Sequence, residues 1–537
     1  MQTKAGHAAA MEEEAAGMFG DEDDEARGPI YTPQVLVNAL NQDPGRPLLH
    51  QLDGPTLSVG DVRDATSRFV QALASLGVGR GTRVGLLSAN RPEVLHVSHA
   101  VQILASVYVP MHPMGGLPDH RHVIEDARVE ILVFDAGRYS ARAAELAAAV
   151  PGLRLVAFGQ SNLGEDLVAL AGAMTPARLV APKVRAGDVT RLAYSGGTTG
   201  KPKSLATNQR TTLACFQIML AEWEWPVPPR VLSCAPLSHA GGTMILPTLL
   251  KNGTMLVLPA FDALAVLEAI QAHRINCMML VPTMIYALLD HPRFAEFDLS
   301  SLETIFYGAS SIAPARLKEA IERIGPVFFQ FYGQAEAPMT VTVLRKAEHD
   351  VNDMVRLASC GRPTPWLDVE LLDDDNQPAP DGEPGEICVR GPLVMDGYRD
   401  NPELNAQTFA GGWLHTGDVA VRDPGGFLRI VDRKKDMIVT GGFNVYPREI
   451  EDILALHPAV SQAAVIGVPH EKWGEAVKAL VVLRPGMTAA EDELIAAVAE
   501  RKGSFQAPKS VVFIDAIPQT AVGKPDKKAL RATHGAG

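Results

Sequence analysis

Short apolar runs recur along this chain, and segments long enough for helices separate many of them. Residues 61–76 place their apolar side chains largely on one helical face, stop at Gly77 and lead into the apolar run 84–87. Alternation of this kind favours largely parallel sheets that are covered by helices. Similar runs follow at 131–134, 153–158, 192–194, 231–235, 255–258, 278–281 and 305–307. The predicted fold class is therefore α/β.

The pattern changes after Asp432, where a shorter segment mixes strands and helices. Its strand-like runs lie at 463–468 and 476–483, and its helix-like segments lie at 447–456 and 491–501. This segment has the size of a small α+β domain, and a chain of 537 residues is too long for one hydrophobic core. We therefore expect a large N-terminal domain of stacked αβ sheets at 29–432, a hinge at 433–436 and a small mobile domain at 437–537.

Charge and composition argue against several classes of protein. The formal net charge of -13 would repel a polyanion, so we expect no nucleic-acid partner. Residues 1–28 are rich in Asp and Glu and almost lack apolar periodicity, which predicts a disordered acidic tail. The five cysteines show no CxxC spacing, which argues against a disulfide framework or a zinc ribbon and favours reduced, buried thiols.

Membrane insertion and export are also not indicated. The sequence does not open with a basic region followed by an apolar run. The best apolar candidate, residues 244–258, is interrupted by Pro247 and by the polar stretch 251–253. We therefore expect no transmembrane segment and a cytoplasmic location.

The segment 192–204 carries the most chemical information, because an apolar strand runs into glycines, hydroxyls and lysines. Glycines let backbone N–H groups turn toward an anion, hydroxyls donate hydrogen bonds, and lysines add positive charge, so the segment predicts a phosphate site. It is not a Walker loop, since Pro202 stands where a magnesium-binding Ser or Thr should follow Lys201. The candidate residues are Ser195, Gly196, Gly197, Thr198, Thr199, Gly200 and Lys203.

This loop resembles the signature loop of the adenylate-forming superfamily, which includes acyl-CoA synthetases, aryl-CoA ligases, peptide-synthetase adenylation domains and beetle luciferases. Other segments resemble the remaining signatures of that family in the expected order, from about Tyr31 to Leu530. The resemblance implies a large N-terminal domain that binds ATP and a small C-terminal domain that rotates between two half-reactions.

Residues 331–336 resemble the aromatic-Gly-x-Thr-Glu motif of this family. The resemblance implies that Tyr332 stacks on adenine beside Gly333, and that Glu336 binds Mg²⁺ through a hard oxygen donor. This chain has Ala335 where the family has threonine, so a hydroxyl that contacts phosphate is missing. It also has Ser204 where glycine is usual.

Two further segments resemble the ribose-binding and hinge motifs. Thr416-Gly417-Asp418 matches the family's TGD, in which the aspartate accepts hydrogen bonds from both ribose hydroxyls. The run 432–438 matches the hinge segment. The resemblance implies that Asp418 and Arg433 contact the ribose and that Lys435 is the pivot.

The C-terminal segment carries two more signatures. Residues 441–451 resemble the glycine loop that lines the pantetheine channel, which implies that Gly441 and Gly442 lie near the thiol arm of coenzyme A. Residues 518–528 resemble the motif of the catalytic lysine, which implies that Lys524 stabilises the charge of the adenylation transition state.

The acid site is less sharply marked. Residues 236–242 resemble the segment that borders the acyl pocket in CoA ligases, where His239 would be a catalytic or gating residue or simply a structural one. Gly308, Ala309 and Ser310 occupy the stretch that borders adenine and the acyl chain in relatives, and their small size predicts room there. No aspartate stands between 237 and 244, which disfavours an amino-acid substrate.

The resemblance implies ATP-dependent activation of a small-molecule carboxylic acid as its acyl-adenylate, with Mg²⁺, followed by transfer to coenzyme A. The acid is expected to be of the fatty-acyl or aryl type, although the sequence leaves its identity open among fatty, aryl and polycyclic acids. It also leaves the oligomeric state open, with a homodimer as one option. Two alternatives stay open from the sequence. One transfers the acyl group to a carrier protein, an amine or another nucleophile, and the other is a degenerate relative that only binds nucleotide.

Lys524→Ala should abolish acid-dependent pyrophosphate release, because the charge that builds on the phosphate loses a stabilising cation; loss of one such group costs about 100- to 1000-fold in rate. Thioester formation from supplied acyl-adenylate should stay largely intact, as measured by mass spectrometry of acyl-CoA. Equal loss of both half-reactions would contradict the assignment.

Overall fold

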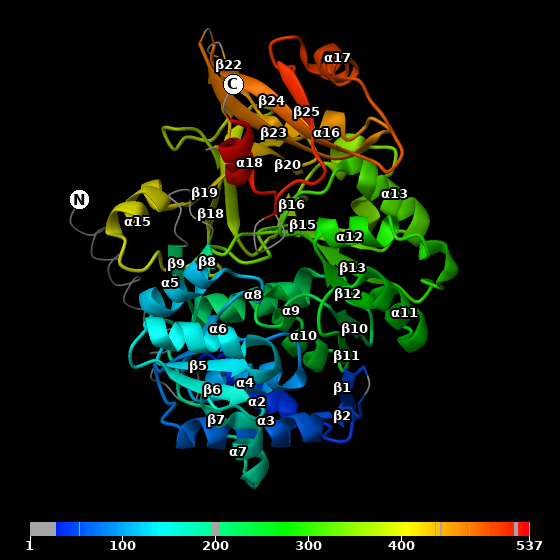
Figure 1. Ribbon diagram of the computed structural model, residues 1–537. Helices are drawn as coiled ribbons and strands as arrows, with labels where there is room; N and C mark the ends of the chain where they lie inside the picture. The colour runs from blue at the N-terminus through cyan, green and yellow to red at the C-terminus, as the bar shows by residue number, and fades with distance from the viewer. Residues whose placement is uncertain are drawn as a thin grey trace, which may run out of the picture.

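A computed structural model describes residues 28–52, 54–195, 203–434, 436–440, 443–471, 473–519 and 525–535. Within these ranges the strands form four sheets, two of them large and mostly parallel. The two large sheets occupy the lower part of the molecule in Figure 1, a four-stranded sheet lies above them, and the C-terminal sheet lies at the top. The predicted α/β class with a smaller C-terminal α+β part is confirmed.

The larger sheet joins parallel strands from distant parts of the chain. Its order is β16-β15-β14-β13-β12-β10-β11-β1-β2, and the pairs from β14 through to β1 are parallel. Its strands are β1 (Pro47–Gln51), β2 (Thr56–Ser58), β10 (Arg230–Ser233), β11 (Thr254–Val257), β12 (Cys277–Leu280), β13 (Thr304–Tyr307), β14 (Phe328–Tyr332), β15 (Thr342–Leu344) and β16 (Arg362–Pro363).

The second sheet has the order β7-β6-β5-β3-β4-β8-β9 and is parallel except at its β8–β9 hairpin. Its strands are β3 (Arg83–Leu87), β4 (Val107–Pro110), β5 (Ile131–Asp135), β6 (Arg154–Phe158), β7 (Glu165–Asp166), β8 (Val189–Ser195) and β9 (Lys203–Asn208). Each apolar run predicted as a strand is confirmed, with ends displaced by a few residues. The strands of the two large sheets that were not predicted are β1, β2, β4, β7, β9, β14, β15 and β16.

Local signals explain where helices begin and end. The helix predicted at 61–76 is α3 (Val59–Ser75), which starts two residues earlier because Ser58 and Asp61 form a capping box. Gly77 follows its end with φ 88°, a conformation that favours glycine. The other helices before residue 410 are α2 (Thr32–Leu40), α4 (Pro92–Ile103), α5 (Leu117–Ala127), α6 (Ala136–Ala149), α7 (Leu167–Ala173), α8 (Gln209–Glu222), α9 (Ala240–Thr243), α10 (Ile245–Leu250), α11 (Ala263–His273), α12 (Pro282–Leu289), α13 (Pro314–Ile324), α14 (Met354–Leu357) and α15 (Pro402–Thr408).

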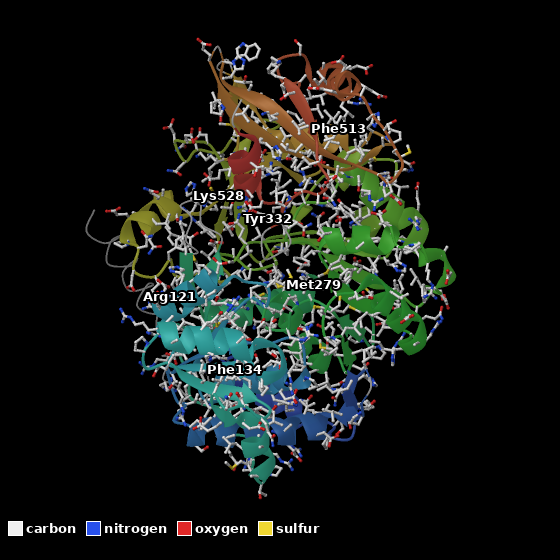
Figure 2. The ribbon with its side chains drawn as sticks, in the orientation of Figure 1. Arg121, Phe134, Met279, Tyr332, Phe513 and Lys528 are labelled. Atoms are coloured by element: carbon white, nitrogen blue, oxygen red, sulfur yellow. The ribbon has the colours of Figure 1, made fainter. Side chains whose placement is uncertain are left out.

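Both faces of each large sheet are buried, which explains why their strands are continuously apolar. Phe306 and Phe329 point into the core between the two sheets, whereas Tyr307 and Phe328 point into the core under α11 to α13. Phe134 belongs to a third core on the outer face of the second sheet (Figure 2). The sheets and their covering helices therefore form alternating layers.

The C-terminal elements form a separate sheet with helices on both sides (Figure 1). Arg448 at the start of its first helix donates from Nη2 to the carbonyl of Ile312, 3.1 Å away in the large part. Its elements are β21 (Ile438–Thr440), β22 (Phe443–Val445), α16 (Pro447–Leu454), β23 (Val460–His470), β24 (Gly474–Leu483), α17 (Glu491–Lys502), β25 (Ser510–Phe513) and α18 (Lys527–His534). The predicted strands and helices of this segment are confirmed.

An antiparallel four-stranded sheet lies between these parts: β17 (Asp368–Leu372), β18 (Gly385–Arg390), β19 (Leu414–Arg422) and β20 (Leu428–Arg433). Its last strand ends at Arg433, where the predicted hinge begins. Lys435, the predicted pivot, and residues 1–27 of the predicted tail lie outside the described residues. The domain boundaries and the hinge stay predictions.

Two sequence expectations concern cysteines and membranes. All five cysteines are described, free and buried, as predicted. No helix in the described ranges is both long and apolar enough to cross a membrane.

Phe306→Ala should destabilise the large domain by about 3 to 5 kcal/mol, the usual range for removing a buried aromatic ring. The Phe306 ring centroid lies 4.6 Å from that of Trp223 and 4.9 Å from that of Trp225, so urea unfolding can be followed by tryptophan fluorescence. Phe513→Ala is the matched control, since its side chain is 40 % exposed. Equal unfolding midpoints for the two variants would contradict the packing described here.

Candidate functional site

Asp418 is the residue on which most candidate nucleotide contacts converge. It lies on β19 opposite Arg433 of β20, and Arg433 Nε is 3.1 Å from Asp418 Oδ1. Tyr332, at the end of β14, donates from Oη to Asp418 Oδ2 at 2.7 Å. Figure 2 shows Tyr332 between the large sheets and the C-terminal elements. Three predicted site residues from separate motifs therefore meet at one carboxylate.

Charge and burial reinforce one another here. Asp418 is 4 % exposed, and its negative charge raises the pKa of Arg433 further. Burial, followed by the charge of Asp418, raises the pKa of Tyr332 well above its ordinary value, so the phenol stays protonated and donates. Gln334 adds a third donor, with Nε2 at 2.5 Å from Asp418 Oδ2.

A carboxylate offers about four acceptor positions, and these three donors occupy most of them. Asp418 thus has room for about one further hydrogen bond as it stands. For Asp418 to accept from both ribose hydroxyls, as the sequence predicts, one of the protein donors must give way. The Tyr332 hydroxyl and the Gln334 amide are the groups that share Oδ2.

A second carboxylate, Glu386, supports the turn that carries Asp418. Glu386 Oε1 accepts from the Gly417 amide at 2.7 Å. Glu386 Oε2 lies 3.1 Å from His415 Nδ1 and 3.4 Å from Lys434 Nζ. His415 Nε2 donates to the Ala410 carbonyl at 3.1 Å, which fixes the ring. The 416–418 turn is therefore held from behind by a buried ionic network.

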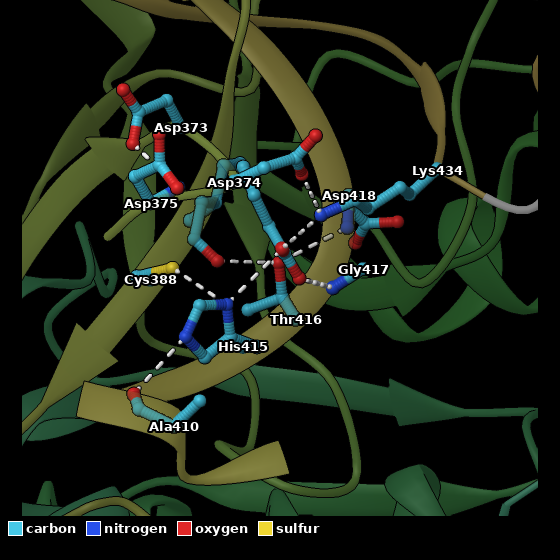
Figure 3. A network of polar contacts seen from close by, with 12 residues as sticks. Asp373, Asp374, Asp375, Cys388, Ala410, His415, Thr416, Gly417, Asp418 and Lys434 are labelled. Carbon is cyan, nitrogen blue, oxygen red and sulfur yellow. Dashed lines mark hydrogen bonds and ion pairs between the residues drawn. The ribbon is translucent and has the colours of Figure 1, made fainter. Parts of the chain in front are cut away.

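Cys388 completes this network, with Sγ 3.4 Å from His415 Nδ1 (Figure 3). Burial, followed by the nearby Glu386 charge, raises the pKa of the Cys388 thiol to about 12, so the thiol is neutral near physiological pH. The donor atoms of Glu386, Cys388 and His415 lie within 4.8 Å of one another. Their mutual contacts and the Gly417 amide account for most of their hydrogen-bonding capacity.

Glu336, the predicted Mg²⁺ ligand, is 7 % exposed. Its Oε1 accepts from Tyr398 Oη at 2.6 Å, and Lys203 Nζ lies 5.7 Å from the centroid of the Tyr398 ring. Tyr398 thus links the end of the glycine-rich segment to the acidic residue. A buried carboxylate with a second oxygen free of described partners fits the oxygen-donor chemistry that Mg²⁺ requires.

The β8–β9 hairpin places the glycine-rich loop. Ser195 and Lys203 are register partners at the ends of the two strands, so residues 196–202 connect them. Several predicted site residues lie outside the described residues: Gly196, Gly197, Thr198, Thr199, Gly200, Gly441, Gly442 and Lys524. Their roles stay predictions.

His239 precedes α9 and is enclosed by other basic or neutral groups. Its Nδ1 lies 2.9 Å from Ser238 Oγ, and its ring centroid lies 4.9 Å from that of His112 in an edge contact. Burial, then the charge of Arg191, then His112, lower the pKa of His239 well below its ordinary value. The imidazole is therefore neutral near physiological pH, which disfavours a role as a fixed positive charge.

The expectation of open space at Gly308 is wrong. A Cβ atom there would come within 2.4 Å of the Phe331 carbonyl oxygen, so glycine is needed because β13 and β14 pack closely. Ala309 is exposed with φ 65°, and Ser310 is half-buried, so these two residues border the turn after β13. Gly333 is similarly constrained, because a Cβ atom would lie 2.4 Å from the Met339 amide nitrogen.

Sequence reasoning missed Gln334, Tyr398 and the Glu386 network as parts of the site. Gln334 lies inside the motif at 331–336. Its polar side chain, two residues after Tyr332, is the feature of the sequence that could have indicated a role in the site. Tyr398 and Glu386 each follow a glycine and have charged residues nearby, but the sequence around them does not name their partners, and only the fold brings them to Glu336 and Gly417.

Comparison with known proteins identifies the family. The AMP-binding enzyme family model matches residues 36–399, and the AMP-binding enzyme C-terminal domain model matches residues 449–524. The chain belongs to the AMP-binding enzyme family. The predicted membership of the adenylate-forming superfamily is thereby confirmed.

Individual relatives are consistent with this. The enzyme is 49 % identical to the medium/long-chain-fatty-acid–CoA ligase FadD8 of Mycobacterium tuberculosis, over 94 % of this chain and 90 % of that protein. It is 37 % identical to a feruloyl-CoA synthase of an Amycolatopsis species, over 90 % of this chain and 95 % of that protein. The solved structure of the amide bond synthetase McbA from Marinactinospora thermotolerans matches with a TM-score of 0.86 and 33 % identity, over 94 % of this chain and all of that one.

The predicted reaction class is confirmed by these relatives. The enzyme is an AMP-forming acid–CoA ligase that uses ATP to form an acyl-adenylate from a carboxylic acid and then transfers the acyl group to coenzyme A. Transfer to a different acceptor, the main alternative from the sequence, is not favoured.

Glu386→Gln should weaken ATP binding by about 10- to 100-fold, because the Gly417 amide, the His415 ring and the Lys434 ammonium all lose a charged acceptor. Isothermal titration with ATP measures the effect. Glu370→Gln is the control, since Glu370 lies on the outer strand β17 and pairs with Arg422 of β19. Unchanged ATP affinity in Glu386→Gln would mean that the network does not set the position of Asp418.

Proposed function

We propose that this enzyme converts a medium- or long-chain fatty acid to its coenzyme A thioester, with Mg²⁺ as the metal cofactor. The observation that carries the choice of acid is an apolar cavity of about 490 Å³ beside α10. Residues of three helices line it, including Val35, Phe216, Leu220, Leu246 and Leu250. The exposed surface of its lining is mostly apolar, as an alkyl chain requires, although Thr32, Asn38, Gln42 and Gln217 also border it.

A short, mostly helical stretch of chain connects one lining residue of the cavity to His239. Leu246 lies seven residues after His239, and most of that interval is the helical segment α9–α10. At 1.5 Å per residue this is about 10 Å, a span comparable with a medium-length alkyl chain. Each methylene that enters contributes about 0.8 kcal/mol of binding free energy. This supports a pocket with the carboxylate near His239 and the tail between α8 and α10.

In the first half-reaction, a carboxylate oxygen of the acid attacks the α-phosphorus of ATP and pyrophosphate leaves. Two anions must approach one another, so the surrounding positive charge determines the barrier. Lys203 and Lys524 supply positive charge from the protein. Bound Mg²⁺, held by Glu336, would neutralise charge on the phosphates.

The nucleotide is held on the opposite side of the reacting atoms. Tyr332 stacks on adenine, and Asp418 and Arg433 contact the ribose, with one Asp418 donor released on binding. Residues 195–200 cradle the phosphates, and the turn of Gly308, Ala309 and Ser310 borders the adenine. His239, neutral in its buried setting, contacts the acid as a hydrogen-bonding group.

In the second half-reaction, the coenzyme A sulfur attacks the acyl carbon, AMP leaves, and the thiol proton passes to solvent. The C-terminal domain rotates about Lys435 between the steps, which withdraws Lys524 and brings Gly441 and Gly442 to the pantetheine arm. A homodimeric assembly and a cytoplasmic location stay predictions from the sequence.

An aryl acid is the second candidate, because a feruloyl-CoA synthase is 37 % identical to this chain. The apolar cavity beyond His239 favours the fatty acid, since a cinnamic acid would leave it largely unfilled.

The test is to supply Mg²⁺-ATP and coenzyme A with octanoate, decanoate, palmitate, ferulate or benzoate, and to follow pyrophosphate and acyl-CoA. Both products with the fatty acids, and higher kcat/KM for these than for ferulate, are expected. Products with aryl acids alone would overturn the choice of acid. Pyrophosphate without thioester would overturn the choice of acceptor.

A cavity-filling variant tests the acyl pocket directly. Leu250→Trp should lower kcat/KM for palmitate at least about tenfold while octanoate is nearly unaffected, because the bulky ring occupies the distal space. Leu456→Trp is the matched control at a position that is 44 % exposed. Equal losses for both acids would contradict a distal tail site.

A further inference from the structure

Arg191 is a half-buried residue of the seven-stranded sheet, and no acidic side chain pairs with it among the residues that the structure describes. It lies on β8 opposite Tyr108 of β4. Tyr108 and Ala193 both pack in the core between the two large sheets, while Leu192 packs in the outer core. Since strand residues alternate between faces, Arg191 points toward the core between the sheets.

Two neighbouring donors on that face lack partners. In the described ranges, Arg191 Nε and Tyr108 Oη are fully buried atoms without any hydrogen-bond partner. A guanidinium keeps its charge in proteins, and burial of an uncompensated charge is costly. Buried donors of this kind call for a ligand, an ion or water. A single oxyanion between the two strands would satisfy both.

Arg191 is close to the acid site rather than to the phosphate loop. Its charge is the largest influence on His239 after burial, ahead of His112. Along β8, Arg191 precedes Ser195 by four residues, or about 13 Å at 3.3 Å per residue. The titratable groups beside it are Tyr108, its register partner on β4, and His239, and His239 in turn contacts His112, so no negative charge is among them. The surroundings are therefore complementary to a carboxylate.

We propose that Arg191, supported by the Tyr108 hydroxyl, binds a carboxylate of the acid substrate. This inference rests on the proposed function, because it assigns the head-group contact of the same acid site. The planar guanidinium matches carboxylate geometry and forms strong charge-assisted hydrogen bonds. Arg191 thereby distinguishes the anionic acid from uncharged molecules with the same tail.

The acid site also predicts an unusual effect on stability. Without substrate, the charge of Arg191 has no described counter-charge, so replacing it with an apolar side chain of similar length removes a destabilising feature. Arg191→Met should therefore keep or raise the melting temperature while it loses acid binding. A purely structural arginine would show the opposite, a lower melting temperature together with general loss of function.

The experiment compares each acid with its primary amide, which has nearly the same shape and no charge. Isothermal titration would measure decanoate against decanamide and ferulate against ferulamide, with wild type, Arg191→Met and Arg191→Lys. Wild type should prefer the acid by about 10- to 100-fold. Arg191→Met should bring the ratio near one, and Arg191→Lys should keep part of it. Arg154→Met, an exposed arginine of the same sheet, is the control.

Kinetics provide a second reading. Arg191→Met should raise KM for the acid while KM for ATP stays unchanged. Decanedioate distinguishes the two carboxylates that a substrate can offer. If Arg191→Met weakens decanoate and decanedioate equally, the reacting carboxylate is bound; if it weakens only decanedioate, a second carboxylate is bound. Only the first result supports the proposal, because the second leaves the ratio of decanoate to decanamide unchanged and shows that Arg191 does not hold the reacting carboxylate.

The inference fails if the acid-to-amide ratio is unchanged in Arg191→Met for whichever pair binds. Failure of the proposed function gives a different result: wild type would bind ferulate and not decanoate, and the ratio of ferulate to ferulamide would then test Arg191. If Arg191→Met does not fold, Arg191→Lys provides the test. An unchanged ratio of acid to amide affinity in Arg191→Lys, together with an unchanged KM for ATP, would overturn the proposal.

Discussion

The carboxylate of Asp418 is the interaction on which the arrangement of the site depends. It joins β19 to the end of β14 through Tyr332, and to the end of β20 through Arg433. Tyr332 and Arg433 are the last residues of their strands, so one buried charge within β19 holds strand ends of two different sheets together. Glu386 accepts a hydrogen bond from the Gly417 amide and so holds the turn before Asp418.

The same arrangement separates charge of opposite sign. The negative groups Asp418, Glu386 and Glu336 surround the candidate nucleotide site, and each has a tyrosine, arginine or histidine donor. Toward the acid site the described neighbours are Arg191, His112 and His239, without a carboxylate. An acid that enters on the side of Arg191 would meet an electrostatic field that favours an anion. A nucleotide that enters on the side of Asp418 would meet carboxylates that accept hydrogen bonds from its hydroxyls.

Much of the fold could be predicted because parallel strands buried on both faces must be apolar throughout. The runs at 131–134 and 305–307 are examples. β4 was not predicted because Val107–Pro110 is short and ends in proline. β14 was not predicted because its last residues, 331 and 332, were assigned to the motif at 331–336. The meeting of Tyr332, Asp418 and Arg433 could be anticipated only through the family resemblance, since 86 residues separate the first two. The partners of Glu336 and the isolation of Arg191 depend on packing between distant segments, for which the sequence holds no local signal.

The apolar cavity is built from α2, α8 and α10, whereas the reactive groups stand on strand ends and in the C-terminal segment. Substitutions in these three helices can therefore reshape the pocket without touching the residues around Asp418. With the proposed acyl pocket in these helices, gene duplication could produce enzymes with new acid preferences while the adenylation machinery is inherited intact. A single scaffold can in this way diversify through its helices and conserve its chemistry through its strand ends.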